Sequence, residues 1–244
     1  CESLSKVTFL TTTVTTVPKS AFEKCQKLTE ITLPSSITNI SEHSFANSGL
    51  TKIEIPSSTT TIENFVFYGC AALAEVTFPD SVTTIGGGIF EGCSSLAKIS
   101  IPSSVETIEQ ASFKGCALLT DVTIPSSVKK ICEGCFEGCT SLAKLSIPSS
   151  VTTIGARAFE GCSSLSEIEL SSNLTSISQG LFGGCASLPT VELPATVTLI
   201  DKESFKGCSS LKEIEIPAAV TKIEESAVFG CSSLAKVTLS TALT

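Results

Sequence analysis

The chain has 244 residues, a formal net charge of −8 and 24 acidic side chains against 16 basic ones. No basic stripe accompanies this acidity, so we expect no nucleic-acid partner. No apolar run reaches the roughly 18 residues that span a bilayer, so we expect no membrane insertion. Hydrophobic residues make up 42% of the chain although it lacks Trp and Met, which indicates a long, thin core of Leu, Ile, Val and Phe.

Residues 1–27 form an irregular first repeat. The unit that opens at Leu4 is 24 residues long, one more than the spacing that follows further along the chain. We expect one continuous repeat array from 28 to 244. The chain starts at Cys1, which corresponds to the recurring Cys of a preceding unit, and stops within another unit, so we interpret it as a fragment of a longer chain.

From Leu50 onward a 23-residue unit recurs, opened by Leu50, Leu73, Leu96, Leu119, Leu142, Leu165, Leu188, Leu211 and Leu234. We number positions within each unit from this Leu, which is position 0. Apolar residues recur at positions 0, 3, 5, 9, 12 and 17, and Cys at position 20. A period of 20–29 residues that starts with Leu-x-x-Ile-x-Ile predicts a leucine-rich-repeat solenoid.

Positions 3 and 5 alternate with polar residues, which predicts a short parallel strand in each unit. A Pro at position 6, such as Pro102 or Pro148, ends that strand because it lacks an N–H. The Ser-Ser-Val-x-x-Ile segment predicts a second extended piece, and the Phe-x-Gly-Cys segment a helical turn closed by its Gly. We therefore predict an all-β-rich repeat solenoid, a right-handed superhelix of about ten units. Strands form one face, and extended or helical-turn segments form the other.

The recurring IPSSV and F-x-G-C elements, as in residues 101–105 and 113–116, resemble the BspA-like (Treponema pallidum-type) leucine-rich repeat family. The resemblance covers about Leu28 to Leu239. It implies a protein at the cell surface or outside the cell, with the cytoplasm as the alternative. It also implies adhesion or host interaction through a protein or glycan ligand.

Nine of the twelve cysteines occupy one column: Cys25, Cys70, Cys93, Cys116, Cys139, Cys162, Cys185, Cys208 and Cys231. An in-register stack points them the same way, whereas a disulfide needs converging Cβ atoms, so we expect buried, reduced thiols. Cys132 and Cys135 form a CxxC, for which zinc or redox chemistry is the alternative. Zinc needs four ligands and the only His is distant, so we predict no metal and no cofactor. We expect Cys135 in the core and Cys132 exposed.

Position 2 alternates in sign through eight units: Lys6, Glu30, Lys52, Glu75, Lys98, Asp121, Lys144 and Glu167. Each charge should meet opposite charges on both neighbouring strands. The alternation ends where Thr190 replaces Lys beside Pro189, and position 4 becomes acidic on three successive strands. Stacked like charges are unfavourable, so this is the candidate partner-binding site: Glu167, Glu169, Thr190, Glu192, Glu213 and Glu215. The alternative is a solvated acidic face on an acidic protein.

No Ser-His-Asp set, Cys-His pair or phosphate-binding loop occurs at a workable spacing, so we predict no enzyme activity. We expect a non-catalytic module that binds protein or glycan through its strand face. The alternative is a structural scaffold without a specific ligand. Such a scaffold would assemble end to end through residues such as Leu4 and Leu239.

Overall fold

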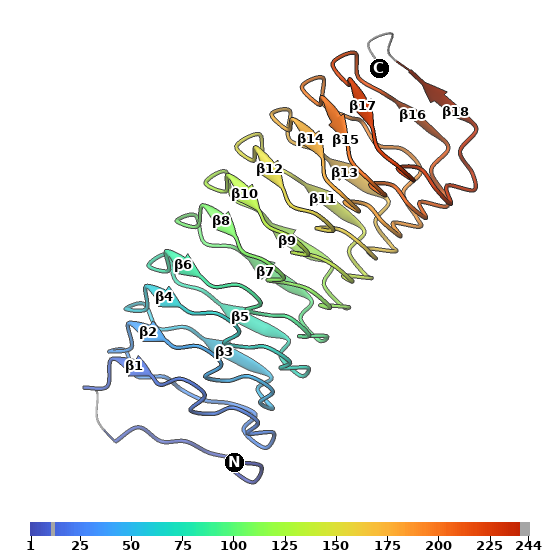
Figure 1. Cartoon of the computed structure of the whole chain (residues 1–244). Coiled ribbons are helices and arrows are strands. Elements are labelled where there is room, and N and C mark those ends of the chain that lie inside the picture. Colours follow the sequence, from blue (N-terminus) through green and yellow to red (C-terminus); the bar gives the residue numbers. More distant parts are fainter. Residues whose placement is uncertain (11–12, 240–244) are drawn as a thin grey trace.

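The computed structural model describes residues 1–10 and 13–239, and shows an elongated solenoid with the two termini at opposite ends (Figure 1). Three-residue strands form what we call the strand face: β3 (Lys52–Glu54), β5 (Glu75–Thr77), β7 (Lys98–Ser100), β9 (Asp121–Thr123), β11 (Lys144–Ser146), β13 (Glu167–Glu169), β16 (Glu213–Glu215) and β18 (Lys236–Thr238).

Two-residue strands form the opposite side, which we call the second face: β1 (Thr16–Val17), β2 (Asn39–Ile40), β4 (Thr61–Ile62), β6 (Thr84–Ile85), β8 (Thr107–Ile108), β10 (Lys130–Ile131), β12 (Thr153–Ile154), β14 (Ser176–Ile177), β15 (Leu199–Ile200) and β17 (Lys222–Ile223). All the paired strands are parallel, and in the regular units each residue lies beside the residue 23 positions away. The predicted solenoid of about ten 23-residue units is confirmed.

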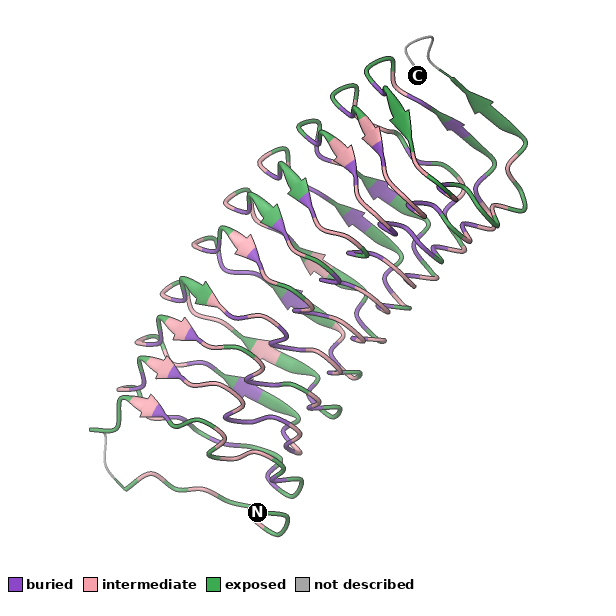
Figure 2. Ribbon diagram, viewed as in Figure 1, coloured by how far each residue is buried: buried purple, intermediate pink, exposed green. Residues whose placement is uncertain are grey.

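The core is a column of stacked phenylalanine rings flanked by the aliphatic side chains of both faces. Neighbouring rings from Phe22 to Phe205 lie 5.2–5.8 Å apart between centroids, and Phe113 and Phe136 are 5.2 Å apart. The opening Leu of each unit from Leu28 to Leu211 is fully buried beside them. Figure 2 shows the buried residues on the inner side of both faces. Because no unit encloses its own rings, each unit depends on its neighbours for burial.

The prediction of a helical turn in the Phe-x-Gly-Cys segment is wrong, because no helix occurs among the described residues. Positions 13 to 20, which we call the turn side, are a run of tight turns. Gly134 and Gly138 adopt left-handed φ angles of 60° and 74°, which a right-handed helix cannot contain. Alternate amides bond to the next unit instead: Phe136 N donates to Ala158 O at 2.8 Å and Gly138 N to Glu160 O at 2.7 Å.

Two recurring side-chain hydrogen bonds explain why Ser and Cys occupy fixed positions in the repeat. The second Ser of the P-S-S-V element donates to a backbone carbonyl of the previous unit, as Ser127 does to Val105 O and Ser150 to Val128 O, both at 2.7 Å. The column cysteines do the same from inside the core, as Cys162 Sγ does to Phe136 O at 3.2 Å. Buried carbonyls therefore gain donors that connect one unit to the next.

The expectation of reduced column thiols holds, since all twelve cysteines are free. From Cys25 to Cys208 the column is buried, and Cys231 in the last described turn is half-buried. Cys135 is buried as expected, but Cys132 is half-buried rather than exposed. Its thiol lies 3.8 Å from a carboxylate oxygen of Glu109 in the neighbouring unit, and the two side chains shield one another.

Removing a ring from the phenylalanine column should destabilise the whole stack. Phe159→Ala should lower the free energy of unfolding by about 3–5 kcal/mol because it leaves a cavity, measured by urea denaturation. Phe229→Ala is the matched control, since Phe229 is 66% exposed, and it should cost less than about 1 kcal/mol. Equal losses in both variants would contradict the stacked core.

The thiol column should make the protein sensitive to alkali. Desolvation on burial raises the pKa of Cys162 to about 12 and raises the pKa of Cys116 and Cys139 as well, whereas unfolded thiols ionise near ~8.5. Between these values the unfolded chain releases protons that the folded chain keeps. Stability is therefore fully present below about pH 8.5 and falls by about 1.4 kcal/mol per pH unit for each such thiol as pH rises above it.

Urea denaturation between pH 7 and 10.5 would measure this loss. In the Cys162→Ala variant the free energy of unfolding should fall less steeply with pH, by the contribution of one released proton. A free energy of unfolding that stays level above pH 9 would refute the prediction.

Candidate functional site

The strand face is not one continuous sheet. Its strands pair as β3–β5, β7–β9, β11–β13 and β16–β18, and residues 190–192 form no strand between β13 and β16. In regular units the amide at position 1 donates to the preceding unit, as Thr120 N does to Ala97 O at 2.9 Å. Pro189 occupies this position and has no N–H to donate. The prediction that the three position-4 glutamates lie on three successive strands is therefore wrong for Glu192.

Two adjoining depressions lie over this interruption and contain all six residues of the predicted site. The larger has a volume of about 700 Å³ and includes Thr190, Glu192, Glu213 and Glu215. The smaller has a volume of about 450 Å³ and includes Glu167 and Glu169 as well as residues 190 and 192. We call the two together the interrupted groove.

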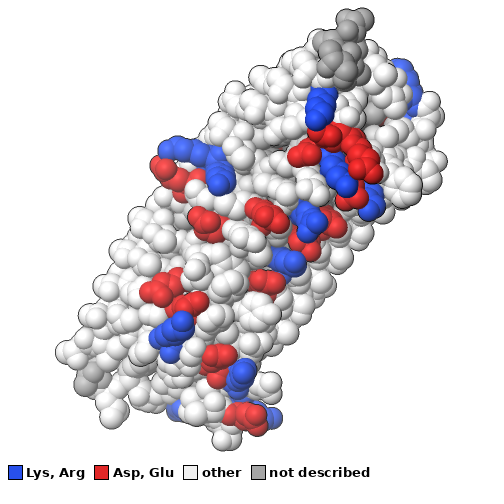
Figure 3. Space-filling view, in the orientation of Figure 1, with Lys and Arg blue, Asp and Glu red and all other residues white. Residues whose placement is uncertain are grey.

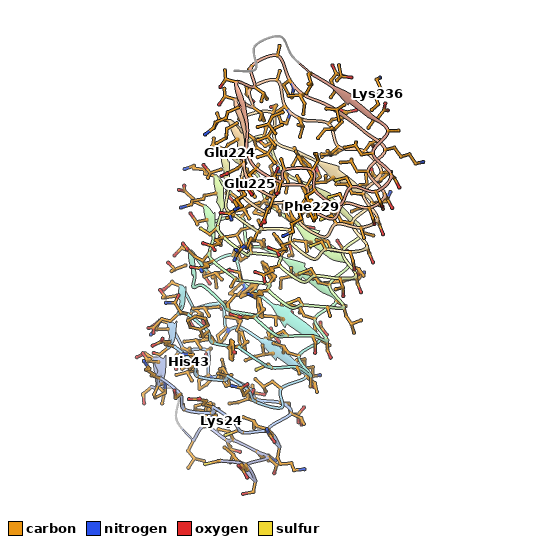
Figure 4. All side chains as sticks on the ribbon, turned by 45° about the vertical axis from the view of Figure 1, so that its right-hand side comes forward. Lys24, His43, Glu224, Glu225, Phe229 and Lys236 are labelled. Atoms are coloured by element: carbon orange, nitrogen blue, oxygen red, sulfur yellow. The ribbon has the colours of Figure 1, made fainter. Side chains whose placement is uncertain are left out.

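Charges within the interrupted groove are only partly compensated. Glu167 pairs with Lys144 at 2.5 Å, and Glu213 pairs with Lys236 at 3.8 Å. Glu169 accepts a hydrogen bond from Ser146 Oγ at 2.7 Å. Glu192 and Glu215 are exposed and pair with no basic side chain of the described chain. Figure 4 shows Lys236 on the opposite side of the C-terminal end from Glu224 and Glu225. The groove thus carries a surplus of negative charge.

Among the eight alternating charges of the described residues, only Lys98 with Asp121 and Lys144 with Glu167 form ion pairs. Lys52 and Glu75 lie side by side across the bonded pair β3–β5 without one. Lys98 lies 3.9 Å from Asp121 across the bonded pair β7–β9. Within the described residues no ion pair joins Glu75 to Lys98 or Asp121 to Lys144, where the strands are not bonded. Exposed pairs contribute only about 0.2–1 kcal/mol. The alternation therefore supports the register of two-stranded sheets and not a continuous charge network.

No metal centre is apparent in residues 1–10 and 13–239, where no three His, Cys, Asp or Glu side chains cluster closely enough to hold an ion. Desolvation, followed by the nearby Glu109 carboxylate, raises the pKa of the Cys132 thiol, which disfavours the thiolate that zinc and redox chemistry require. The charged side chains in Figure 3 form separate clusters of mixed sign, and no basic stripe runs along the face shown.

Sequence reasoning missed an aromatic cluster at the N-terminal end of the turn side. The His43 and Phe65 rings stack with centroids 5.2 Å apart, and Tyr68 meets the Phe65 ring edge-on at 6.0 Å. Phe65 has a left-handed φ of 56°. The available signal was aromatic residues at positions 15 and 18, where most other units carry small or charged side chains, Phe229 being an exception. Sequence reasoning also missed Leu193 and Pro217, which line the interrupted groove.

The model of the BspA type leucine rich repeat region matches residues 1–118 and 129–244. The chain belongs to this family. A leucine-rich repeat protein from Bacteroides ovatus is similar over 95% of this chain and 66% of its own, with 29% identity and a TM-score of 0.77. A leucine rich cell surface protein from Faecalibacterium prausnitzii is 30% identical over 92% of this chain and 69% of its own, with a TM-score of 0.60.

The leucine rich repeat protein TpLRR of T. pallidum is 34% identical over 62% of this chain and 72% of its own, with a TM-score of 0.57. This family member therefore spans about two thirds of the length of these three structures. Among curated proteins none matches the chain. In the described part of this repeat protein, no helix is long and apolar enough to cross a membrane.

Restoring the missing lysine should stabilise the interrupted groove. Thr190→Lys would place a cation between the carboxylates of Glu167 and Glu213. It should raise the free energy of unfolding by up to about 1 kcal/mol at low salt. Thr190→Gln, similar in length but uncharged, is the control. Urea denaturation in 20 mM and 1 M NaCl should show a gain for the lysine variant that shrinks with salt. A gain of equal size for glutamine would contradict the electrostatic interpretation.

Proposed function

We propose that this repeat protein is a non-catalytic binding module whose interrupted groove receives a basic segment of a protein ligand. The observation that supports this is the coincidence of two depressions with a local surplus of carboxylates. Glu192 and Glu215 face solvent without a basic partner among the described residues. Like charges on neighbouring units cost free energy, and an occupant of opposite charge would recover it.

In the groove, as in the units that open at Leu4 and Leu28, the backbone of the strand face is not committed to a sheet. Between β13 and β16 the chain runs through residues 190–192 without a strand. A partner that brings N–H donors would bond to carbonyl oxygens of this segment, next to Pro189 O, which already accepts from Lys212 N at 3.0 Å. Binding would thus combine backbone hydrogen bonds with charge complementarity, which favours specificity and a fast association rate.

Cell-surface display and adhesion are part of the same proposal. They are supported by the similarity to the leucine rich cell surface protein of F. prausnitzii. A glycan ligand is the alternative occupant of the groove, and the experiment below separates it from a protein.

The division of the chain into an irregular first repeat, residues 1–27, and a repeat array, residues 28–244, stays a prediction. Phe22 nevertheless stacks on Phe45 at 5.3 Å, so the first repeat joins the core.

The test uses the chain immobilised against a panel of purified extracellular-matrix proteins and, separately, a glycan array. The combined variant Glu169→Gln, Glu192→Gln and Glu215→Gln should weaken capture of a basic protein by at least about tenfold in 150 mM salt, equivalent to about 1.4 kcal/mol. Glu54→Gln is the matched control, because Glu54 holds the same position in β3, far from the groove, and it should bind normally.

Capture that is insensitive to the combined variant would refute the groove as the site. Glycan binding that depends on the same residues would replace the protein ligand by a sugar. Self-association lost on Leu4→Asp or Leu239→Asp, with no ligand captured, would favour the end-to-end scaffold. Leu239 is 58% exposed and Leu4 packs partly against the core.

A further inference from the structure

The junction between the unit that opens at Leu73 and the unit that opens at Leu96 differs from its neighbours. We call it the 73/96 seam. Elsewhere in the described array, every two successive units share at least one pair of bonded strands, such as β4–β6 before the seam and β8–β10 after it. At the 73/96 seam neither face is bonded, because β5 does not pair with β7 and β6 does not pair with β8.

The hydrogen bonds lost at the seam can be identified by comparison with regular units. The amide at position 13 normally donates to the carbonyl at position 12 of the preceding unit, as Cys132 N does to Ile108 O and Gly155 N to Ile131 O, both at 2.8 Å. The equivalent bond, from Glu109 N to Ile85 O, is not formed. The bond at position 10 is also missing, although Lys129 N donates to Glu106 O at 2.8 Å one unit later.

The second face is open where these bonds are missing. A depression of about 370 Å³ lies between the two units and is lined by Thr83, Ile85, Glu106 and Glu109 among others. Ile85 is half-buried, whereas the equivalent Ile62 and Ile131 are fully buried. In Figure 1, β6 and β8 end two separate stacks of strands. The seam therefore exposes apolar surface that other junctions cover.

The turn side stays closed at the same junction. Gly88 N donates to Gln110 O at 2.8 Å and Phe90 N to Ser112 O at 2.9 Å. The Phe90 and Phe113 rings still stack, but their planes are tilted by 22°, against 5–18° at the other steps of the column. Ser104 Oγ also donates to Val82 O across the junction, and Leu118 N donates to Ser94 O at 3.3 Å. The two units are thus joined along the turn side and at these two bonds, whereas neither pair of facing strands is bonded.

Another junction shows how such a gap can be closed. β12 and β14 are also unpaired, but Ser178 Oγ donates to Ile154 O at 2.5 Å, and β11 pairs with β13 on the opposite face. At the 73/96 seam position 13 is Glu109, whose side chain lies toward Cys132 of the following unit instead. A hydroxyl at position 13 therefore substitutes for the missing backbone donor at one junction and is absent at the other.

We propose that the 73/96 seam is a hinge about the turn side, which divides the array into a block ending at residue 95 and a block starting at residue 96. The second block carries the interrupted groove. Opening and closing of the second face would change the angle between the strand faces of the two blocks. Each block would remain cooperative, because its own units are joined by strand pairs and stacked rings.

Amide hydrogen exchange of the whole chain, followed by mass spectrometry, tests whether the blocks are coupled. Phe67→Leu perturbs the first block and Phe159→Leu perturbs the second, both at fully buried rings. Each variant should speed exchange at least tenfold in its own block, reported by β2 and β4 or by β10 and β12. It should change exchange in the other block less than twofold. Equal acceleration in both blocks would overturn the hinge.

A second variant asks whether the missing hydrogen bond causes the separation. Glu109→Ser should supply a hydroxyl to Ile85 O, as Ser178 does at its junction, so that the effect of Phe67→Leu then spreads to β10 and β12. Glu224→Ser is the matched control, since Glu224 N already donates to Ile200 O at 2.8 Å, and it should leave the separation unchanged. If Glu109→Ser leaves the blocks uncoupled, the assignment of the gap to this bond is wrong.

Discussion

The stacking of each phenylalanine ring on the ring of the next unit sets the geometry of this repeat protein. The centroid separation of 5.2–5.8 Å is slightly larger than the roughly 4.8 Å spacing of bonded strands. Rings and strands at the same junction therefore prefer slightly different separations. Strands of only two or three residues form few backbone hydrogen bonds, so they cannot hold every pair of units at the strand spacing. Continuous stacking with discontinuous sheets is the arrangement that results.

This constraint explains why the strand face divides into two-stranded sheets. A pair such as β11–β13 gains its ladder together with the ion pair from Lys144 to Glu167, and the next junction opens. Where Pro189 removes a donor, the chain loses a strand altogether and two depressions form. The interrupted groove and the 73/96 seam both lie where the sheet is interrupted while the rings continue to stack.

Much of the fold was predictable from the sequence. The positions of Leu, Ile, Phe and Cys follow directly from stacking, so the core, the parallel register and the free thiols were all predicted. The turn side was not, because Ala111 and Arg157 adopt left-handed φ angles that these residue types rarely take. Pairing across the strand face was also mispredicted, since opposite charges face each other both at Glu75–Lys98, where the strands are not bonded, and at Lys98–Asp121, where they are. The six groove residues were found through a break in a charge pattern, whereas Leu193 and Pro217 carry no such signal.

The thiol column has a consequence for how the protein is made. From Phe67 to Phe205, each carbonyl of the phenylalanine column accepts the amide of its own unit's Cys and the S–H of the next unit's Cys, as Phe136 O does from Cys139 and Cys162. Sulfur therefore contributes here as a hydrogen-bond donor and a small apolar group. No cysteine needs a covalent partner, so a nascent chain can add turns one at a time without an oxidant or an isomerase. Folding of the array therefore does not depend on the redox potential of the compartment in which it takes place.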